Sequence, residues 1–400
     1  MITHDVEVLV VGLGPVGATT ALYLARHGIT VAGIEALPAP ASDLRASTVH
    51  APTIEMLDAL GAANVVLNYG LRAPEYQFRD RQSGETFSFD MSELADRTRF
   101  PFRVQCEQHK LAEDVVDQLG GEASVQLRYG QRLIWLGEHD GGVSAYVETS
   151  RDVECYRARY VIGADGAGSL VRKLMALGFD GFTYGEKYLC LSTQYPIEEA
   201  FDGLCHVNYV SDPDEWLVLL RVPSVWRVML PVREDEDDQT LLSDTRKDAV
   251  FRRILGHDAP VTTHHRTIYR LHQRVADRFV AGRVALVGDA AHLNSPMGGF
   301  GMNSGIHDGI NLGQKLVAIL REGGDARLVE LFDRQRRQMT HDFIQAQSIA
   351  NMAMMRSGWG AARDQRREKM ADLSKDREAR RAFLLSQAMF TSLEQAAAIQ

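Results

Sequence analysis

The first 35 residues alternate between apolar strand-like runs and a helical pattern. Val6–Val11 is a short β-branched run with one polar interruption, which is typical of a strand buried on both faces of a parallel sheet. After it, apolar residues recur at helical spacing, Pro15 suits a first helical turn, and Gly28 suits a helix end. A second strand over residues 30–35 follows, so this segment predicts a β-α-β unit.

Two later segments repeat one pattern, an apolar strand that ends on an aspartate beside glycine. They are residues 160–165 (YVIGAD) and 284–289 (VALVGD). Because such strands lie far apart in the chain, we expect one sheet assembled from separated pieces. Between the last two, the pattern predicts an antiparallel sheet with strands over residues 188–195, 204–210, 216–222 and 226–232.

Turn residues extend this picture. Pro223-Ser224 predicts a hairpin turn between the last two of these strands. Residues 80–90, with Ser83-Gly84 as the turn, predict a hairpin that joins the same sheet. From residue 326 to about 358, apolar positions fall on one helical face, which predicts C-terminal helices.

Composition places the chain among ordinary soluble proteins. It has 400 residues, of which 45% are apolar and 24% charged, so a large core can form and extensive disorder is excluded. The net charge of −9 lacks the positive field that would gather nucleic acid or anionic lipid. The four cysteines are widely spaced, without the C-x-x-C pair or tight framework of secreted proteins, which favours reduced thiols.

The N-terminus enters its first apolar run without a basic region or a small-residue cleavage site. No apolar stretch approaches the roughly 20 residues of a membrane helix. We therefore expect a cytoplasmic protein without integral membrane contact and without a nucleic-acid partner.

The first strand ends in a G-x-G-x-x-G motif. Gly12 allows a tight turn, Gly14 lets the backbone approach a pyrophosphate, and Gly17 lets helix and strand pack closely. The phosphates would face the helix N-terminus, where N–H groups are unpaired, and Glu35 would accept hydrogen bonds from a ribose. This motif alone leaves both NAD and FAD open.

Two longer motifs decide between these cofactors. They are GADGAGS over residues 163–169, followed by Val171-Arg172, and GDAAH over residues 288–292, followed by PMGGFGMN over residues 296–303. Asp289 at a strand end can accept hydrogen bonds from a ribityl chain, which NAD lacks. The glycines allow N–H groups to approach a flat ring, and a helix beginning near Met302-Asn303 would direct its positive dipole end at a reduced flavin.

With these three motifs the sequence resembles the FAD-dependent aromatic hydroxylases, the single-component flavoprotein monooxygenases typified by para-hydroxybenzoate hydroxylase. The resemblance covers most of residues 1 to about 320. It implies an α/β fold, α+β overall, with a Rossmann-like FAD-binding domain, an interleaved antiparallel-sheet substrate domain and C-terminal helices. We expect these units over residues 1–72, 100–180 and 280–325 for FAD binding, 73–99 and 181–279 for the substrate domain, and 326–400 for the helices.

The resemblance also implies roles for single residues. Arg45 matches an arginine that contacts the FAD pyrophosphate, and Gln108 matches a glutamine near the adenosine and ribityl part. Asp165 lies in a motif used for both FAD and the nicotinamide donor, and Pro296 matches a proline whose carbonyl faces the reacting oxygen and the substrate ring, a catalytic position. Ser295 stands where relatives often have a second proline, so we expect a looser loop here.

The expected FAD-binding residues are drawn from these motifs and their surroundings. They are Gly12, Gly14, Pro15, Val16, Gly17, Glu35, Ala36, Arg45, Gln108, Leu133, Asp165, Gly288, Asp289, Gly299, Gly301, Met302 and Asn303.

Substrate contacts are expected from the hairpin and from Pro296. Alternation places Leu219 and Arg221 on one face, and we group them with Arg227 and Met229 of the partner strand. The other face would carry Trp216, Val218, Val228 and Leu230. Arg221 or Arg227 could pair with a substrate carboxylate, although an exposed strand arginine is the commoner situation.

The histidines and cysteines do not predict a metal site. His292 is expected to be a structural hydrogen-bonder, and His264 and His265 point to opposite faces of a strand. Metal-binding and serine-nucleophile motifs are absent from the sequence, so a cofactor should carry the hard step.

The resemblance implies a monooxygenase of phenolic or heteroaromatic small molecules. NADH or NADPH would reduce FAD, O₂ would add at flavin C4a, and the resulting hydroperoxide would attack the ring. Rival functions are another flavin reaction, such as halogenation or reduction, or a non-catalytic nucleotide-binding regulator. The W-x-W-x-I-P run of flavin halogenases is missing. Substrate, ring position and nicotinamide donor stay open, and a homodimer is a further expectation.

Overall fold

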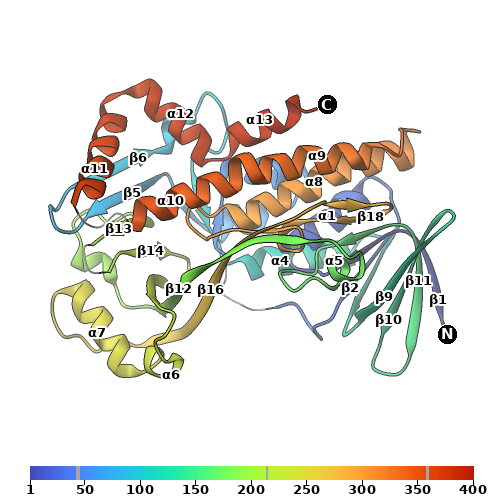
Figure 1. The fold of residues 1–400 in the computed structure, drawn as a ribbon, viewed down its shortest axis with the longest axis horizontal. Helices are drawn as coiled ribbons and strands as arrows, with labels where there is room; N and C mark the ends of the chain where they lie inside the picture. The colour runs from blue at the N-terminus through green and yellow to red at the C-terminus, as the bar shows by residue number, and fades with distance from the viewer. Residues whose placement is uncertain (42–45, 213–214, 357–359) are drawn as a thin grey trace.

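The computed structural model describes residues 1–41, 46–212, 215–356 and 360–400, so the predicted role of Arg45 lies outside the described residues. Two large sheets and a group of long helices make up the fold (Figure 1). The first sheet has the strand order β17-β18-β11-β1-β2-β8, and in addition β10 pairs with β11 and β9 pairs with β10. Its strands are β1 (Thr3–Val11), β2 (Val31–Glu35), β8 (Val125–Tyr129), β9 (Arg132–His139), β10 (Gly142–Glu148), β11 (Val153–Gly163), β17 (Val280–Ala281) and β18 (Val284–Leu286).

The three strands that precede the sequence motifs lie side by side in this sheet, as predicted. β1 pairs in parallel with both β2 and β11, and β11 pairs in parallel with β18. Their carboxyl ends therefore meet at one edge of the sheet, which is where ligands bind in parallel α/β sheets.

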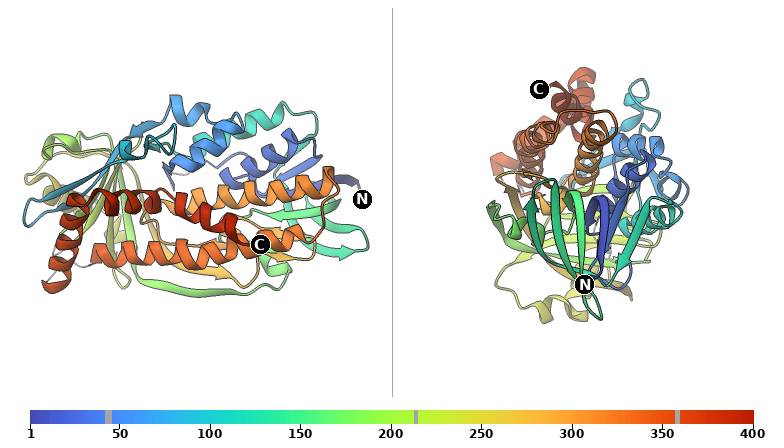
Figure 2. Two further views of the ribbon diagram at one scale, coloured as in Figure 1. Left: turned by 90° about the horizontal axis from the view of Figure 1, so that it is seen from above. Right: turned by 90° about the vertical axis from the view of Figure 1, so that its right-hand side faces the viewer.

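Helices cover the parallel sheet and meet at this edge. α1 (Pro15–Arg26) packs against α4 (Gln108–Gly120) and α8 (Phe300–Arg321). α8 and α9 (Leu328–Met339) lie side by side along the long axis of the molecule (Figure 2). Shorter elements of this part are β3 (Thr48–Val49), α2 (Ala51–Ala59), α3 (Asn64–Asn68), β4 (Leu71–Ala73), β7 (Arg103–Gln105) and α5 (Leu170–Leu174).

The second sheet has the order β19-β16-β12-β15-β14-β13-β5-β6, and its β13–β5 pair is parallel. Both predicted hairpins are present: β5 and β6 pair around residues 81–85, and Val222 N–H donates to Val225 O across the Pro223-Ser224 turn. The strands are β5 (Glu75–Asp80), β6 (Thr86–Asp90), β12 (Phe179–Thr193), β13 (Val207–Ser211), β14 (Leu217–Arg221), β15 (Trp226–Arg233), β16 (Thr263–Ala276) and β19 (His292–Leu293).

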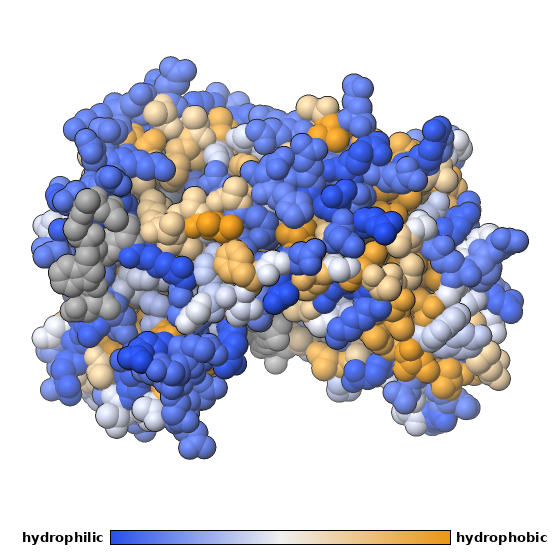
Figure 3. Space-filling model, in the orientation of Figure 1, coloured by the Kyte–Doolittle hydropathy of each residue, from blue (hydrophilic) through white to orange (hydrophobic). Residues whose placement is uncertain are grey.

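The two faces of this sheet have different coverings. We call the inner face the one that carries Tyr188, Val218 and Met229. It packs against three C-terminal helices, α10 (Ala346–Arg356), α11 (Gly360–Lys375) and α12 (Arg377–Gln387). The outer face carries Leu219 and Val228 and is closed by α7 (Asp244–Leu255). The lobe with α6 (Asp238–Leu241) and α7 forms a mainly hydrophilic projection at the lower left of Figure 3. A notch in the lower outline separates it from the part of the molecule on the right.

The helical region predicted from residue 326 begins with one long, continuous helical segment. It comprises α9 (Leu328–Met339), a π-helical segment over Thr340–Gln345 and α10 (Ala346–Arg356). The π-helical segment was not predicted. Three further helices follow: α11 (Gly360–Lys375), α12 (Arg377–Gln387) and α13 (Phe390–Ala398). Arg366 of α11 lies 3.0 Å from the buried carboxylate of Asp80, which ties this helix to the β5–β6 hairpin.

None of the helices in the described part of the chain is both long and apolar enough to cross a membrane.

Candidate active site

The glycine motif forms a turn at the edge where the three parallel strands end. Gly12 has a φ of +97°, and a Cβ there would lie 2.4 Å from Ala164 O; a Cβ on Gly17 would lie 2.0 Å from Gly12 O. A Cβ on Gly14 would meet no heavy atom within 4 Å. Gly12 and Gly17 thus permit close packing, whereas Gly14 opens onto free space at the start of α1.

That open space faces the N-terminus of α1. Gly14 is the N-cap, no side chain caps the helix, and Pro15 occupies the first turn. The first-turn N–H groups, including those of Val16 and Gly17, therefore have no partner within the helix, and they carry the positive end of the helix dipole. This is a ready site for a pyrophosphate.

Glu35 stands beside this turn in a fixed orientation. Its Oε2 accepts a hydrogen bond from Leu13 N–H at 3.0 Å, and its Oε1 accepts one from Leu37 N–H at 2.9 Å. Each carboxylate oxygen keeps further acceptor capacity for a ribose hydroxyl. Ala36 follows it on the surface, and the neighbouring residue Gln131 donates its N–H to Glu35 O.

Two other predicted residues lie around this strand end. Leu133 is buried on β9, two residues beyond Gln131, and Gln108 is the first residue of α4, where its N–H donates to Ala46 O. Their contacts with FAD stay predictions.

Asp165 has a structural task in addition to any contact with cofactor. Its carboxylate accepts hydrogen bonds from Ser169 Oγ at 2.5 Å, from Leu170 N–H at 2.7 Å and from Val171 N–H at 3.1 Å. Arg172, which follows this turn, donates to Ala290 O at 2.7 Å. The second and third motifs are therefore joined directly by a buried arginine.

The third motif packs against the first. Gly288 has a φ of +61°, and a Cβ there would lie 3.2 Å from Val16. Asp289, the next residue along the chain, is exposed. His292 is buried, and its Nε2 lies 2.8 Å from Asp308 Oδ2, in line with the structural role predicted for it.

The loop before α8 is built for a close approach. Gly298 and Gly299 have φ values of +103° and +72°, and α8 begins at Phe300 rather than near Met302-Asn303 as predicted. No side chain caps this helix, so its first-turn N–H groups, including those of Gly301 and Met302, are unpaired within it.

Hydrogen bonds fix this loop against the segment that follows Arg45. Asn303 Nδ2 donates to Thr48 O at 2.8 Å, and Asn303 Oδ1 accepts from His50 N–H at 2.9 Å. The Pro296 carbonyl accepts Gly299 N–H at 2.9 Å, so one of its lone pairs is used inside the turn. The role expected for Pro296 toward substrate remains a prediction.

The looser loop expected at Ser295 was wrong. Ser295 is fully buried, its N–H donates to Gln273 Oε1 at 2.9 Å, and its Oγ lies 3.4 Å from Ser348 O. A serine can donate twice where a proline cannot donate at all, and these bonds tie the loop to β16 and α10.

The face assigned to the substrate hairpin was partly wrong. Register pairs Leu219 with Val228, and Arg221 with Trp226. Directly paired residues share a face, so Leu219 and Arg221 lie on the outer face, away from Arg227 and Met229. The two-residue turn causes this, because it pairs each odd-numbered residue of β14 with an even-numbered residue of β15.

Arg227 and Met229 lie on the inner face, which looks toward the α8 loop. Arg227 is 3% exposed, and its Nη1 lies 3.4 Å from Ser47 Oγ. Met229 Sδ accepts from Tyr269 OH at 3.1 Å, and Met297 of the loop belongs to the same apolar cluster as Met229. The inner face and the loop therefore enclose one common region.

Sequence reasoning missed a polar group on β7 that faces this region. Arg103 and Gln105 are both buried, and Val104 between them belongs to the core cluster around the first sheet. A three-residue strand offers too little alternation to reveal a face. The nearby run at residues 103–108 was used only for Gln108.

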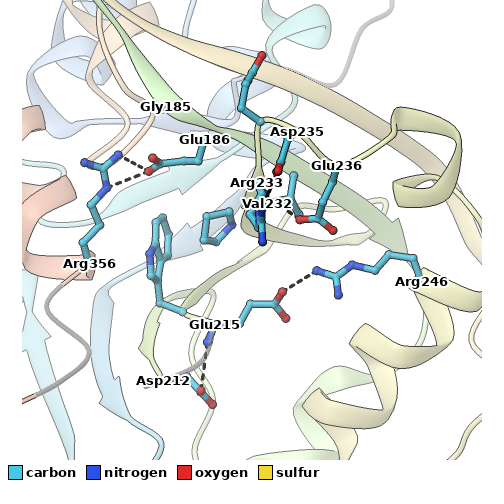
Figure 4. A pocket seen from close by; sticks show the side chains of 13 residues that line it. Gly185, Glu186, Asp212, Glu215, Val232, Arg233, Asp235, Glu236, Arg246 and Arg356 are labelled. Atoms are coloured by element: carbon cyan, nitrogen blue, oxygen red, sulfur yellow. Dashed lines mark hydrogen bonds and ion pairs between the residues drawn. The ribbon is translucent and has the colours of Figure 1, made fainter.

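A separate cavity of about 690 Å³ opens at the other end of the inner face, around Trp216 (Figure 4). Its charged groups satisfy each other: Arg356 pairs with Glu186, and Arg246 Nη2 lies 2.6 Å from Glu215 Oε1. Glu186 lies six residues along β12 from the pair of Arg227, about 20 Å away. The cavity around Trp216 is therefore distinct from the region near the α8 loop.

Comparison with known proteins gives a consistent result. A family model described as an FAD binding domain matches residues 5–347. The chain is 30% identical to para-nitrophenol 4-monooxygenase of Pseudomonas sp. (strain WBC-3), over 94% of both chains. It belongs to the FAD-dependent aromatic hydroxylases.

Solved structures agree with this membership. The crystal structure of p-nitrophenol 4-monooxygenase from Pseudomonas putida DLL-E4 superposes with a TM-score of 0.91 at 29% identity, covering 99% of each chain. A ternary complex of aklavinone-11 hydroxylase with FAD and aklavinone has a TM-score of 0.79 at 25% identity, covering 89% of this chain and 70% of the other. The protein is an FAD-dependent monooxygenase, and an NADH or NADPH donor is typical of these hydroxylases.

The residues present fit FAD. The open space above Gly14 and the uncapped start of α1 suit the pyrophosphate, Glu35 suits the adenosine ribose, and Asp289 suits the ribityl chain. The uncapped start of α8 suits the negative charge of a reduced flavin ring. Bound FAD would supply electron transfer from the nicotinamide and activation of O₂. The part left to the chain's own residues would be to position the ring, exclude water and orient substrate.

Proposed function

We propose that this protein hydroxylates a single-ring phenol that carries an electron-withdrawing group, with O₂ and NADH or NADPH. The observation that carries this proposal is the match to para-nitrophenol 4-monooxygenase over 94% of both chains. The inner face supports a small substrate, because Met352 and Leu384 of the C-terminal helices pack against it.

For attack at a ring C–H, the balance is phenol, O₂, NAD(P)H and one proton giving hydroxylated phenol, NAD(P)⁺ and water. One oxygen atom enters the ring, and the other leaves as water with two electrons from the nicotinamide. A site that admits water instead releases H₂O₂ without product, so water exclusion decides the yield.

The test is a panel of phenols, 4-nitrophenol, hydroxybenzoates and hydroxypyridines with the FAD-loaded protein. We expect one subset of phenols to stimulate NADH or NADPH oxidation and to give a product with added oxygen by mass. Measuring H₂O₂ separates coupled from uncoupled turnover. If no phenol stimulates oxidation and no oxygenated product forms, the proposal is wrong.

We also propose a cytoplasmic location, a homodimer and the three-unit division over residues 1–72, 100–180 and 280–325, 73–99 and 181–279, and 326–400. Light scattering on the purified protein tests the dimer by its mass. Limited proteolysis tests the division, which predicts first cuts near residues 326–328 and not inside α8.

A further inference from the structure

Arg103 is a buried cation that lacks an anionic partner in the described part of the chain. It is 1% exposed, and its guanidinium lies over the Tyr76 ring with 4.1 Å to the centroid. Among the described residues, its Nε and Nη1 atoms have no hydrogen-bond partner. A buried charge of this kind costs several kcal/mol unless a counter-charge compensates it.

The neighbours of Arg103 are also short of acceptors. Gln105 projects from the same side of β7, and its Oε1 already accepts from Thr48 Oγ1 at 3.1 Å. Within the part of the chain that the structure describes, its Nε2 donor has no partner, and neither has the hydroxyl of Tyr76. This cluster therefore offers several buried N–H donors and one positive charge to a common space. An acceptor-rich group with negative charge would satisfy these donors and compensate the charge together.

The cluster lies next to the loop that we assign to the flavin ring. His50 connects the two: its Nε2 lies 2.8 Å from Gly298 O. A carbonyl oxygen only accepts, so Nε2 carries the proton. Burial and the nearby Arg103 guanidinium hold the pKa of His50 well below its usual value, so His50 is neutral. The net charge that this cluster presents is therefore positive.

The inner face closes the region from the other side. Arg227 reaches Ser47 Oγ, and Ser47 Oγ lies 3.5 Å from Gln105 Oε1. Tyr76 lies on β5, in the same apolar cluster as Met229 and Met297. A ring held between the loop and the inner face would thus have Arg103 and Gln105 at its edge.

We propose that Arg103, together with Gln105, binds the negatively charged oxygen of an ionised phenol and selects this form of the substrate. The proposal rests on the proposed function, since it assigns the anionic end of the same aromatic substrate. The planar guanidinium and its fixed N–H directions suit an oxyanion in the plane of a ring. An ionised phenol is also the more electron-rich ring for attack by an electrophilic oxygen.

The test measures binding to the FAD-loaded protein by the change in flavin absorbance. The two ligands are 4-nitrophenol, at a pH where it is ionised, and 4-nitroanisole, the neutral methyl ether of the same shape. We expect Arg103→Met to weaken nitrophenolate binding by about 10- to 100-fold and to leave nitroanisole binding within twofold. Arg103→Lys should recover part of the loss, because it restores the charge without the fork.

Arg72→Met is the matched control. Arg72 lies on β4 in the same three-stranded sheet, paired with Val104, and its guanidinium also lies over an aromatic ring, that of Phe102. It is exposed and points away from the cluster, so both ligands should bind this variant as they bind the wild type. Retention of FAD and an unchanged melting temperature show that each variant is folded.

The outcomes separate the two proposals. Equal losses for both ligands, no loss for nitrophenolate, or release of FAD from Arg103→Met would each overturn the role of Arg103. If nitrophenolate binding depends on Arg103 but no phenol supports turnover, the anion site stands and the proposed function fails. If phenols are hydroxylated equally well by the wild type and Arg103→Met, the function stands and the anion site fails.

Discussion

Two buried arginines, Arg103 and Arg336, are each 1% exposed but have opposite surroundings. Arg336 on α9 donates from Nε to Asp308 Oδ1 at 2.7 Å and from Nη2 to Ser304 Oγ at 3.2 Å. Asp308 in turn accepts from Gly288 N–H, so this ion pair braces the third FAD motif. Arg103 has no such carboxylate among the described residues.

The difference indicates what each charge is for. Burial would raise the pKa of Asp308, but Arg336 and His292 lower it below its usual value, so the carboxylate stays charged, and both of its oxygens have partners. A buried ion pair of this kind serves the fold. A buried cation that has no carboxylate partner in the described part of the chain points instead to an anionic ligand, and Arg103 lies where the substrate is expected.

The largest expected effect concerns stability. Arg336→Met should lower the free energy of unfolding by about 3–5 kcal/mol, because it leaves the buried Asp308 carboxylate uncompensated. Arg103→Met should change it far less, since it strands no partner. Urea unfolding of both variants measures this contrast. Equal losses of unfolding free energy in the two variants would show that Arg103 is a structural residue and would contradict the difference between the two arginines.

The surroundings of Arg336 should also make the stability of the fold depend on pH, through the buried residue His307. Burial and Arg336 lower the pKa of His307 from 6.5 to about 3. Below pH 6.5 the unfolded chain therefore binds a proton that the folded chain does not, and stability falls as the pH drops toward 3. This group alone contributes at most about 1.4 kcal/mol per pH unit. Urea unfolding between pH 7 and pH 5 should show a shallower slope for His307→Gln, and an unchanged slope would contradict this assignment.

The smallest effects concern the two faces of the hairpin. Arg227→Met should raise the KM for a phenol about tenfold, because Arg227 is buried on the inner face beside Ser47. Arg221→Met should change KM less than twofold, because Arg221 lies on the outer face. Steady-state kinetics with the best phenol of the panel compares them. The reverse order would restore the face predicted from sequence.

The fold and the motif positions could be predicted because their signals are local. A glycine such as Gly12, which needs a positive φ and a close approach to Ala164, stands next to the strand that requires it. The same holds for the strand ends at Gly163 and Gly288. Local signals of this kind can be recognised in the sequence without any knowledge of distant contacts.

The features that could not be predicted from the sequence depend on strand register and on contacts between residues far apart in the chain. Leu219 was assigned to the wrong face because pairing across the Pro223-Ser224 turn was not counted. Arg103 escaped notice because only the docking of β7 against β5 and the 47–50 segment shows that it is buried and unpaired. Ser295 differed because its hydrogen-bond partners, Gln273 and Ser348, lie far along the chain.

The most direct measurement is a crystal structure of the FAD-loaded protein with a bound phenolate, such as 4-nitrophenolate. The account predicts that the phenolate oxygen lies within hydrogen-bond distance, roughly 3 Å, of Arg103 Nε or Nη1. The ring would then lie between the loop at residues 296–299 and the inner face. A phenolate oxygen bound elsewhere, with Arg103 paired to a protein carboxylate or to FAD, would contradict it.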